Sequence, residues 1–133
     1  MKECITFTDG GARGNPGPAA IGVVIKSGTG ETVKSYGRYI GETTNNQAEY
    51  QALVSALEEV HKLGAEVVHC NLDSELLVKQ MNREYRVKDA GLQTHFIKAW
   101  NIAVGFKKVT FTHIPRERNT EADAEVNRAL DSR

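Results

Sequence analysis

Four acidic residues, widely separated along the chain, could do chemistry together; they are Asp9, Glu49, Asp73 and Asp123. Two of them end strand-like segments, and the other two lie near the starts of expected helices. Each also has a local explanation. Asp9 could begin an Asp-Gly turn, and Asp73 could cap a helix. Glu49 and Asp123 could complete capping boxes with Asn46 and Thr120.

Their combined positions favour one shared site. Glu49 is followed three and four residues later by apolar residues, so its side chain should point with them toward a sheet. Asp123 is aligned in the same way with apolar residues of the last helix. Asp9 and Asp73 would lie close together if their strands were parallel neighbours, because such strands are only about 4.8 Å apart.

Such a cluster of carboxylates has a predictable chemistry. The four charges would repel one another, and desolvation would favour their protonated forms. The sequence places too few lysines or arginines near them to neutralise the cluster. Divalent cations would balance these charges, and ligation by oxygen alone suits Mg²⁺ or Mn²⁺. Two such ions about 3.5–4 Å apart are a known arrangement for in-line displacement at phosphorus.

Nine expected elements must position these acids within one domain of 133 residues, of which 40% are apolar. Three strands joined by turns suggest an antiparallel meander, and the later strands alternate with helices, which predicts a mixed sheet with helices packed on it. The expected strands are 3–9, 19–26, 32–40, 66–72 and 107–114, and the expected helices are 44–63, 74–83, 93–104 and 119–130.

Composition excludes some classes of protein. Seventeen basic and seventeen acidic residues give no net charge, so any nucleic-acid site must be local or built around metal ions. The longest apolar run, 19–25, is shorter than the roughly 20 residues of a membrane span. The N-terminus passes directly into a strand pattern, which argues against a signal peptide. Cys4 and Cys70 are interpreted as buried thiols in a reducing cytoplasm, or as a disulfide if their strands are neighbours.

Four motifs around these acids resemble the type 1 ribonuclease H family over nearly the whole chain; they occupy residues 7–18, 43–49, 72–74 and 116–123. The resemblance implies an α/β, ribonuclease H-like fold in a single domain, residues 1–133. It has a mixed five-stranded sheet in the order 3-2-1-4-5, with helices on both faces. The implied activity is a metal-dependent endonuclease that cuts the RNA strand of RNA–DNA hybrids and leaves 5′-phosphate and 3′-hydroxyl ends.

The resemblance also implies roles for the four acids as ligands of two ions, Mg²⁺ or Mn²⁺. Asp9 would bridge both ions. The ion shared with Asp123 would activate the attacking water, and the ion shared with Glu49 and Asp73 would stabilise the leaving 3′ oxygen.

Substrate contacts implied by the resemblance fall on the same motifs; the candidates are Gly10, Gly11, Asn15, Thr44, Asn45, Ser74, Glu75 and Asn119. Asn15, Asn45 and Glu75 would contact 2′-hydroxyls of the RNA strand across its shallow minor groove. Thr44, with nearby backbone amides, would hold a phosphate of the DNA strand. The alternative for the two asparagines is turn and cap chemistry, and Ser74 could serve only as a helix cap.

Two departures from the family pattern bear on the mechanism. Many relatives carry a strongly basic helical handle before the last strand, whereas here only four basic residues fall within 79–88. We interpret this as the compact form without the handle, with modest affinity for the hybrid, or simply as a solvated face. Many relatives also carry a histidine in the loop before the last acid. His113 falls in a strand pattern and suits a structural role, so Arg116 is the candidate for the assisting role.

Two other functions remain open from the sequence. A nuclease of the same fold could prefer double-stranded RNA, because phosphate and shape contacts are common to both duplexes. A catalytically silent module could bind hybrids without cutting them, although the presence of all four acids argues against it. The expected partner is an RNA–DNA hybrid, and no membrane association is expected. The protein is expected to be a monomer in the cytoplasm.

Overall fold

The computed structural model describes residues 2–133. Met1, the first residue of the segment that argued against a signal peptide, lies outside the described residues. The elements follow the predicted alternation of strands and helices. They are β1 (Glu3–Ala12), β2 (Gly17–Ser27), β3 (Thr32–Thr43), α1 (Asn45–Lys62), β4 (Val67–Leu72), α2 (Glu75–Met81), α3 (Ala90–Ala103), β5 (Lys108–His113), a 3₁₀ helix (Arg116–Arg118) and α4 (Thr120–Asp131).

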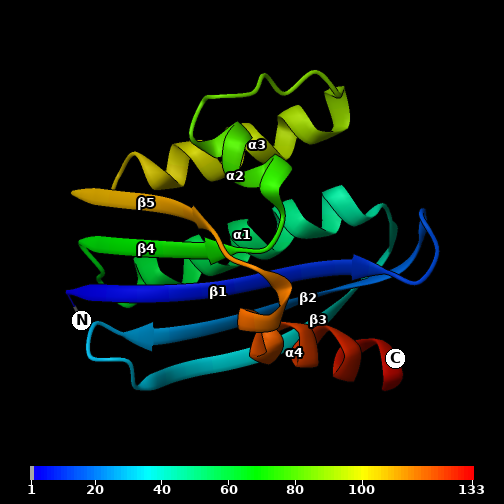
Figure 1. Cartoon of the computed structure of the whole chain (residues 1–133), viewed down its shortest axis with the longest axis horizontal. Helices are drawn as coiled ribbons and strands as arrows, with labels where there is room; N and C mark the ends of the chain where they lie inside the picture. The colour runs from blue at the N-terminus through cyan, green and yellow to red at the C-terminus, as the bar shows by residue number, and fades with distance from the viewer. Residues whose placement is uncertain (1) are drawn as a thin grey trace.

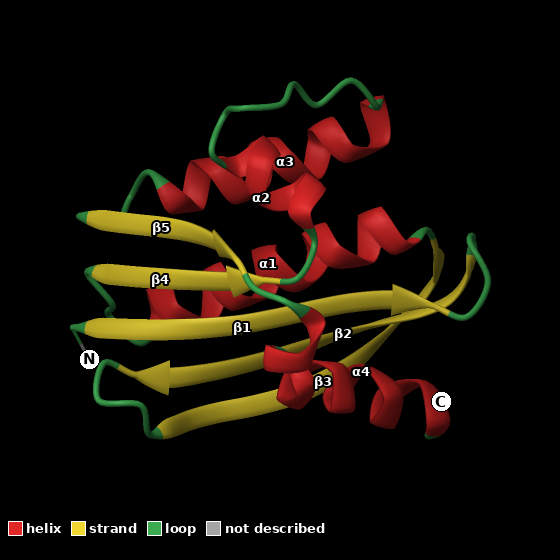
Figure 2. Cartoon of the chain, in the orientation of Figure 1, coloured by secondary structure: helices red, strands yellow, loops and turns green. Residues whose placement is uncertain are grey.

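A mixed five-stranded sheet in the order β3-β2-β1-β4-β5 forms the centre of the fold, which confirms the predicted topology (Figure 2). β1 pairs antiparallel with β2 and parallel with β4. In the parallel pair, Thr8 lies opposite Leu72. The next residues along the two strands are Asp9 and Asp73, so the sheet brings these acids to the same end.

Helices cover both faces of this sheet. In Figure 1, α1 lies behind the sheet and α4 in front of it. α1 packs against β1 and β2, with α3 beside it, and its buried residues belong to the main core, which also includes Val68 and Leu72. α4 packs against β1, β2 and β3 through a separate small cluster of Ala20, Val126 and Leu130, with Ala129 beside it.

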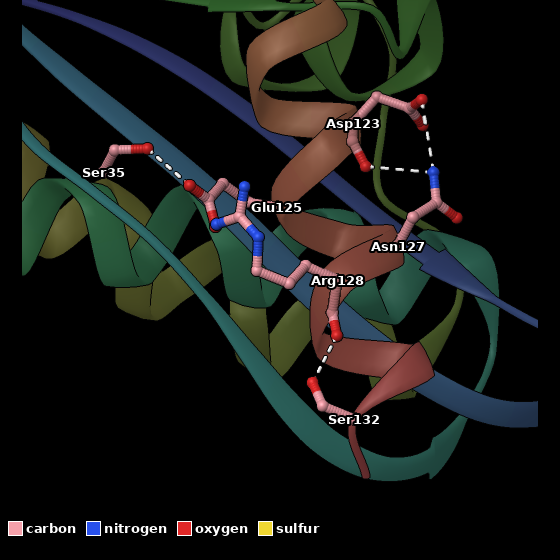
Figure 3. A network of polar contacts seen from close by, with 6 residues as sticks. All are labelled: Ser35, Asp123, Glu125, Asn127, Arg128 and Ser132. Atoms are coloured by element: carbon pink, nitrogen blue, oxygen red, sulfur yellow. Dashed lines mark hydrogen bonds and ion pairs between the residues drawn. The ribbon is translucent and has the colours of Figure 1, made fainter.

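Polar contacts also join α4 to the edge strand. The carboxylate of Glu125 accepts a hydrogen bond from Ser35 Oγ of β3 at 2.7 Å and pairs with Arg128 on its own helix (Figure 3). α4 lies so close to the sheet that a Cβ added at Gly37 would overlap the backbone of Glu125. The position of the last helix therefore depends on small residues and a few polar contacts more than on a large apolar surface.

Several local expectations are wrong, each because a different contact prevails. β1 does not end at Asp9 but continues to Ala12, because Gly10 and Gly11 remain paired with β2. The first helix is capped by Thr44, which accepts from Gln47 N, so the alternative capping box of Asn46 and Glu49 does not form. α3 begins three residues earlier than expected because the carboxylate of Asp89 caps it.

The two remaining local explanations for the acids also fail. Ser74, not Asp73, caps α2 by accepting from Leu77 N. α4 begins after Asn119 without a side-chain cap, so Thr120 and Asp123 form no capping box. All four acids are thereby free of the capping and turn roles that the sequence alone allowed.

Two further expectations concern thiols and membranes. Cys4 and Cys70 are buried on neighbouring strands, but they lie opposite Val68 and Thr6, and no disulfide joins them in the described chain. Burial raises the pKa of the Cys70 thiol to about 12. Between residues 2 and 133, no helix combines the length and apolar character that crossing a membrane requires.

Candidate active site

The carboxylates of Asp9, Glu49 and Asp73 converge where β4 ends beside β1. One oxygen from each lies within 4.8 Å of the corresponding oxygens of the other two. The parallel register of β1 and β4 places the two aspartates side by side, and α1 supplies the glutamate from the face of the sheet that it covers. The three acids are partly buried. Their carboxylates are therefore shielded from bulk water, yet an ion can still reach them.

Glu49 is fixed by the contact between α1 and β1. Its Oε1 accepts a hydrogen bond from Gly10 N at 2.5 Å. A Cβ added at Gly10 would come within 2.5 Å of Glu49 N and overlap the carbonyl of Ala48, so only glycine allows this approach. The first turn of α1 therefore rests directly on the strand that carries Asp9.

Asp123 completes the cluster from α4. It lies close enough to Asp9 to help raise the pKa of that carboxyl. Asn127, one turn later, donates from Nδ2 to the backbone oxygen of Asp123 at 3.1 Å and to its carboxylate at 3.4 Å (Figure 3). All four acids line one groove of about 430 Å³, so the site combines two neighbouring strands and two helices.

The electrostatics of the cluster are those of crowded anions. Burial, followed by the charges of Asp73 and Asp123, raises the pKa of Asp9 to about 7. Burial and the charges of Asp9 and Asp73 raise the pKa of Glu49 well above its usual range, although the Gly10 amide opposes this. Within residues 2–133, none of the four acids forms an ion pair with a lysine or arginine. An oxygen-only set with uncompensated negative charge suits a divalent cation.

The raised pKa of Asp9 predicts that the metal-free protein loses stability as the pH rises from about 4 to about 7. In this range the unfolded chain releases the proton that folded Asp9 retains, so the folded state binds more protons and the free energy of unfolding falls with pH. Allowing for partial exposure and titration shared with Glu49, we expect a loss of about 2 kcal/mol. Urea midpoints in EDTA at several pH values measure it.

A matched variant separates this effect from other titrations. Glu49→Gln removes a second carboxyl group whose pKa is raised and should flatten the pH dependence. His95, whose pKa burial lowers, acts in the opposite direction below about pH 6.5 and is common to both proteins. Equal slopes for wild type and Glu49→Gln would show that the acids do not titrate as a cluster.

The expected substrate contacts fall into two groups. Those that line the groove are Gly10, Gly11, Asn45 and Ser74, together with Arg116 from the 3₁₀ helix. Those outside its lining are Asn15, Thr44, Glu75 and Asn119. Thr44 caps α1, and Glu75 is exposed and paired with Lys79.

The asparagines have structural contacts as well. Asn15 Oδ1 accepts from Asn45 N at 2.9 Å, and Asn45 Oδ1 accepts from Ala12 N at 2.8 Å, so the pair joins the β1–β2 loop to α1. Asn119 is 1% exposed, and its Nδ2 donates to the backbone oxygen of Thr8 at 2.8 Å. This bond ties the segment before Asp123 to the strand residue before Asp9.

Two groove residues were missed by sequence reasoning. Asn127 could have been found, because it lies four residues after Asp123 on the same helix face. Arg13 carried no signal of its own beyond its place in the first motif, and its partner Asp131 is 118 positions away in the chain. His113 ends β5, as its strand pattern predicted, and its side chain is exposed.

The weak basic patch extends from Lys79 of α2 onto the connection between α2 and α3, which contains no helix and confirms the compact form without a handle. Two of its side chains are engaged locally. The Arg83 guanidinium lies 5.9 and 5.3 Å from the ring centres of Phe96 and Trp100, and Lys79 pairs with Glu75.

Comparisons with known proteins agree with this architecture. The sequence profile of the Reverse transcriptase-like family matches residues 7–129. Ribonuclease HI of Halobacterium salinarum is 43% identical over 125 residues, and the Mycobacterium tuberculosis bifunctional protein Rv2228c is 40% identical over 133 residues. The alignments cover 94% and 99% of this chain but only 63% and 36% of those relatives.

Solved structures give the same result. The crystal structure of RNase H1 from Halobacterium salinarum superposes with a TM-score of 0.96 at 41% identity, over 98% of this chain and 99% of that one. LC11-RNase H1, from a compost metagenome and solved in complex with an RNA/DNA hybrid, gives 0.92 at 48% identity over 97% of both chains. By sequence, topology and four converging acids, the chain belongs to the type 1 ribonuclease H family.

Proposed function

We propose that this protein is a metal-dependent endonuclease that hydrolyses the RNA strand of RNA–DNA hybrids, leaving 5′-phosphate and 3′-hydroxyl ends. The supporting observation is the convergence of four partly buried carboxylates in one open groove, without a lysine or arginine ion-paired to them in the described chain. A relative 48% identical to this chain was solved with an RNA/DNA hybrid bound, which supports the same substrate here.

Asp9, Glu49, Asp73 and Asp123 would hold two Mg²⁺ or Mn²⁺ ions. Such ions supply an activated water and stabilise negative charge on the leaving oxygen. Asp9 is suited to be the shared ligand, because its carboxylate interacts with all three other acids. The Gly10 amide holds Glu49 in place, and Asn127 restrains Asp123, so the ligands are positioned before any ion arrives.

Selection of RNA would depend on the rim of the groove. Asn15, Asn45 and Glu75 are the proposed contacts to 2′-hydroxyls, which distinguish the cut strand from DNA. Thr44 and nearby backbone amides would hold a phosphate of the DNA strand, and Gly10, Gly11 and Ser74 would line the path of the RNA. Asn119 would act indirectly, by keeping the segment before Asp123 against β1.

Arg116 is proposed to assist turnover, because it is exposed on the 3₁₀ helix and lines the groove beside the acids. Arg116→Ala should reduce kcat about tenfold, a typical size for the loss of one charge-assisted contact in the transition state. Lys88→Ala is the matched control, since Lys88 is an exposed cation outside the groove lining. Steady-state cleavage rates compare the two, and equal effects would remove the assisting role of Arg116.

The proposed function is tested by incubating labelled RNA–DNA hybrid, double-stranded RNA and double-stranded DNA with the protein and Mg²⁺ or Mn²⁺. We expect cleavage of the RNA strand of the hybrid alone. Equal or faster cleavage of double-stranded RNA would reassign the substrate, and tight binding without cleavage would indicate a silent hybrid-binding module.

The setting of this activity is part of the proposal. Residues 1–133 would form one domain that acts as a monomer and does not associate with a membrane. The buried Cys4 and Cys70, which no disulfide joins in the described chain, fit a reducing cytoplasm.

A further inference from the structure

The groove that contains the acids continues well past them along α4. Its lining includes Val126, Asn127 and Leu130, and it reaches Arg13 in the β1–β2 loop. From Asp123 to Leu130 the helix rises about 10 Å, at 1.5 Å per residue. Three of the acids fit within 4.8 Å of one another, so the groove offers considerably more length than the metal ligands need.

Arg13 is held at the far end of this groove. Its backbone is fixed, because Arg13 N donates to Pro18 O at 2.8 Å and the neighbouring Ala12 N donates to Asn45 Oδ1 at 2.8 Å. Its side chain reaches across to α4, where Nη2 lies 2.7 Å from Asp131 Oδ1. The two side chains remain 45% and 67% exposed, so solvent or a ligand can reach both partners.

The charges of the groove show what Arg13 can contribute. Within the described chain, the charged residues of its lining are the four acids, Arg13 and Arg116. Two divalent cations would neutralise the four carboxylates, which leaves the two arginines as the remaining charges of the lining, with Arg13 paired to Asp131 outside it. Arg116 precedes the N-terminus of α4, and Arg13 lies beside its C-terminal end. A strand of phosphates running along α4 would therefore meet a fixed cation on each side of the acids.

We propose that Arg13 forms a subsite for a backbone phosphate of the strand that is cut, two or three nucleotides from the reacting phosphate. The inference rests on the proposed function, because the acids define which strand occupies the groove. About 10 Å corresponds to roughly three phosphates at one charge per 3.4 Å of duplex axis in each strand. Asp131 holds the arginine in position until a phosphate replaces it.

The exchange is physically reasonable. Exposed ion pairs contribute little to stability, so Arg13 can leave Asp131 at small cost. A guanidinium binds phosphate through two parallel hydrogen bonds, which are stronger than a single exposed contact. Arg13 would contact a phosphate and not the sugar. It would therefore increase the affinity for the hybrid without contributing to the selection of RNA over DNA.

The test is the dissociation constant of a fluorescent RNA–DNA hybrid, measured by anisotropy in Ca²⁺ over a range of salt concentrations. Arg13→Ala should weaken binding roughly fivefold to tenfold and reduce the slope of log Kd against log salt by about one. Arg13→Lys should restore the slope and part of the affinity. The matched control is Arg38→Ala, an exposed arginine of β3 outside the groove lining, which should change neither quantity.

A second variant tests the exchange with Asp131. Asp131→Asn should tighten binding about twofold, and this gain should disappear when Arg13 is already alanine, as two coupled residues require. Unchanged affinity and slope in Arg13→Ala, or the same loss in Arg38→Ala, would overturn the subsite. Parallel assays in Mg²⁺ keep the two proposals apart. A hybrid that binds through Arg13 but is not cut contradicts the proposed function alone, and a hybrid that does not bind contradicts the subsite as well.

Discussion

Asp9→Asn should abolish cleavage of an RNA–DNA hybrid while leaving the fold intact. The substitution removes the carboxylate that interacts with the three other acids and would be shared between the ions. We expect kcat to fall by at least about three orders of magnitude, comparable with the loss of a central electrostatic group elsewhere. The metal-free variant should be more stable by about 2 kcal/mol at pH 8, because a crowded charge with its pKa raised to about 7 is gone.

Three measurements check this prediction together: single-turnover cleavage, calorimetric titration with Mn²⁺, and urea unfolding in EDTA. Glu58→Gln is the matched control, because it neutralises an exposed acid of α1 that does not line the groove of the acids. Glu58→Gln should match wild type in all three. Near wild-type cleavage by Asp9→Asn would leave the metal assignment without support.

Gly10→Ala should damage both stability and ion binding, whereas Gly11→Ala should leave both nearly unchanged. A Cβ at Gly10 would lie 2.5 Å from Glu49 N and overlap the Ala48 carbonyl, and these are backbone atoms that cannot rotate away. Relief requires α1 to move off β1, which costs about 3 kcal/mol and displaces Glu49 from the cluster. At Gly11 the nearest atom would be a side-chain methyl of Val126 at 3.8 Å, an ordinary contact.

The two neighbouring glycines therefore serve as test and control in the same strand. Urea unfolding with saturating and without added Mn²⁺ separates lost packing from lost ion binding. We expect Gly10→Ala to weaken Mn²⁺ binding as well as stability, and Gly11→Ala to change the free energy of unfolding by less than about 1 kcal/mol. Similar behaviour of the two variants would contradict the close approach of α1 to β1.

Hydrophobic periodicity predicted a mixed sheet with packed helices, and the family resemblance carried by four motifs implied its strand order, which the structure confirms. Glu49 illustrates why part of the site was predictable too. Its place on the apolar stripe of a helix already directs the side chain toward the sheet, and the structure shows it bonded to Gly10. The pairing of Asp9 with Asp73 required the order of the strands, which the family resemblance supplied and the parallel register confirms.

Contacts between distant segments were not predictable in the same way. The Asp-Gly pair at position 9 has the composition of a turn, yet pairing of Gly10 with Ile21 keeps it in a strand. Asn119 has the type and place of a helix cap, but its side-chain amide donates to the backbone oxygen of Thr8, 111 residues away. Local sequence shows what a residue can do, whereas its partner depends on packing that only the fold determines.

The separate small apolar cluster beneath α4 has a consequence for dynamics. Elements with little buried apolar surface open by local unfolding more readily than the central strands of a sheet. α4 contributes only Val126, Leu130 and Ala129 to its cluster, whereas β1 and β4 contribute to the main core. Partial detachment of this helix would withdraw Asp123 while Asp9, Glu49 and Asp73 stay in place. Asp123 is therefore the acid of the four whose position depends most on how firmly one helix stays packed.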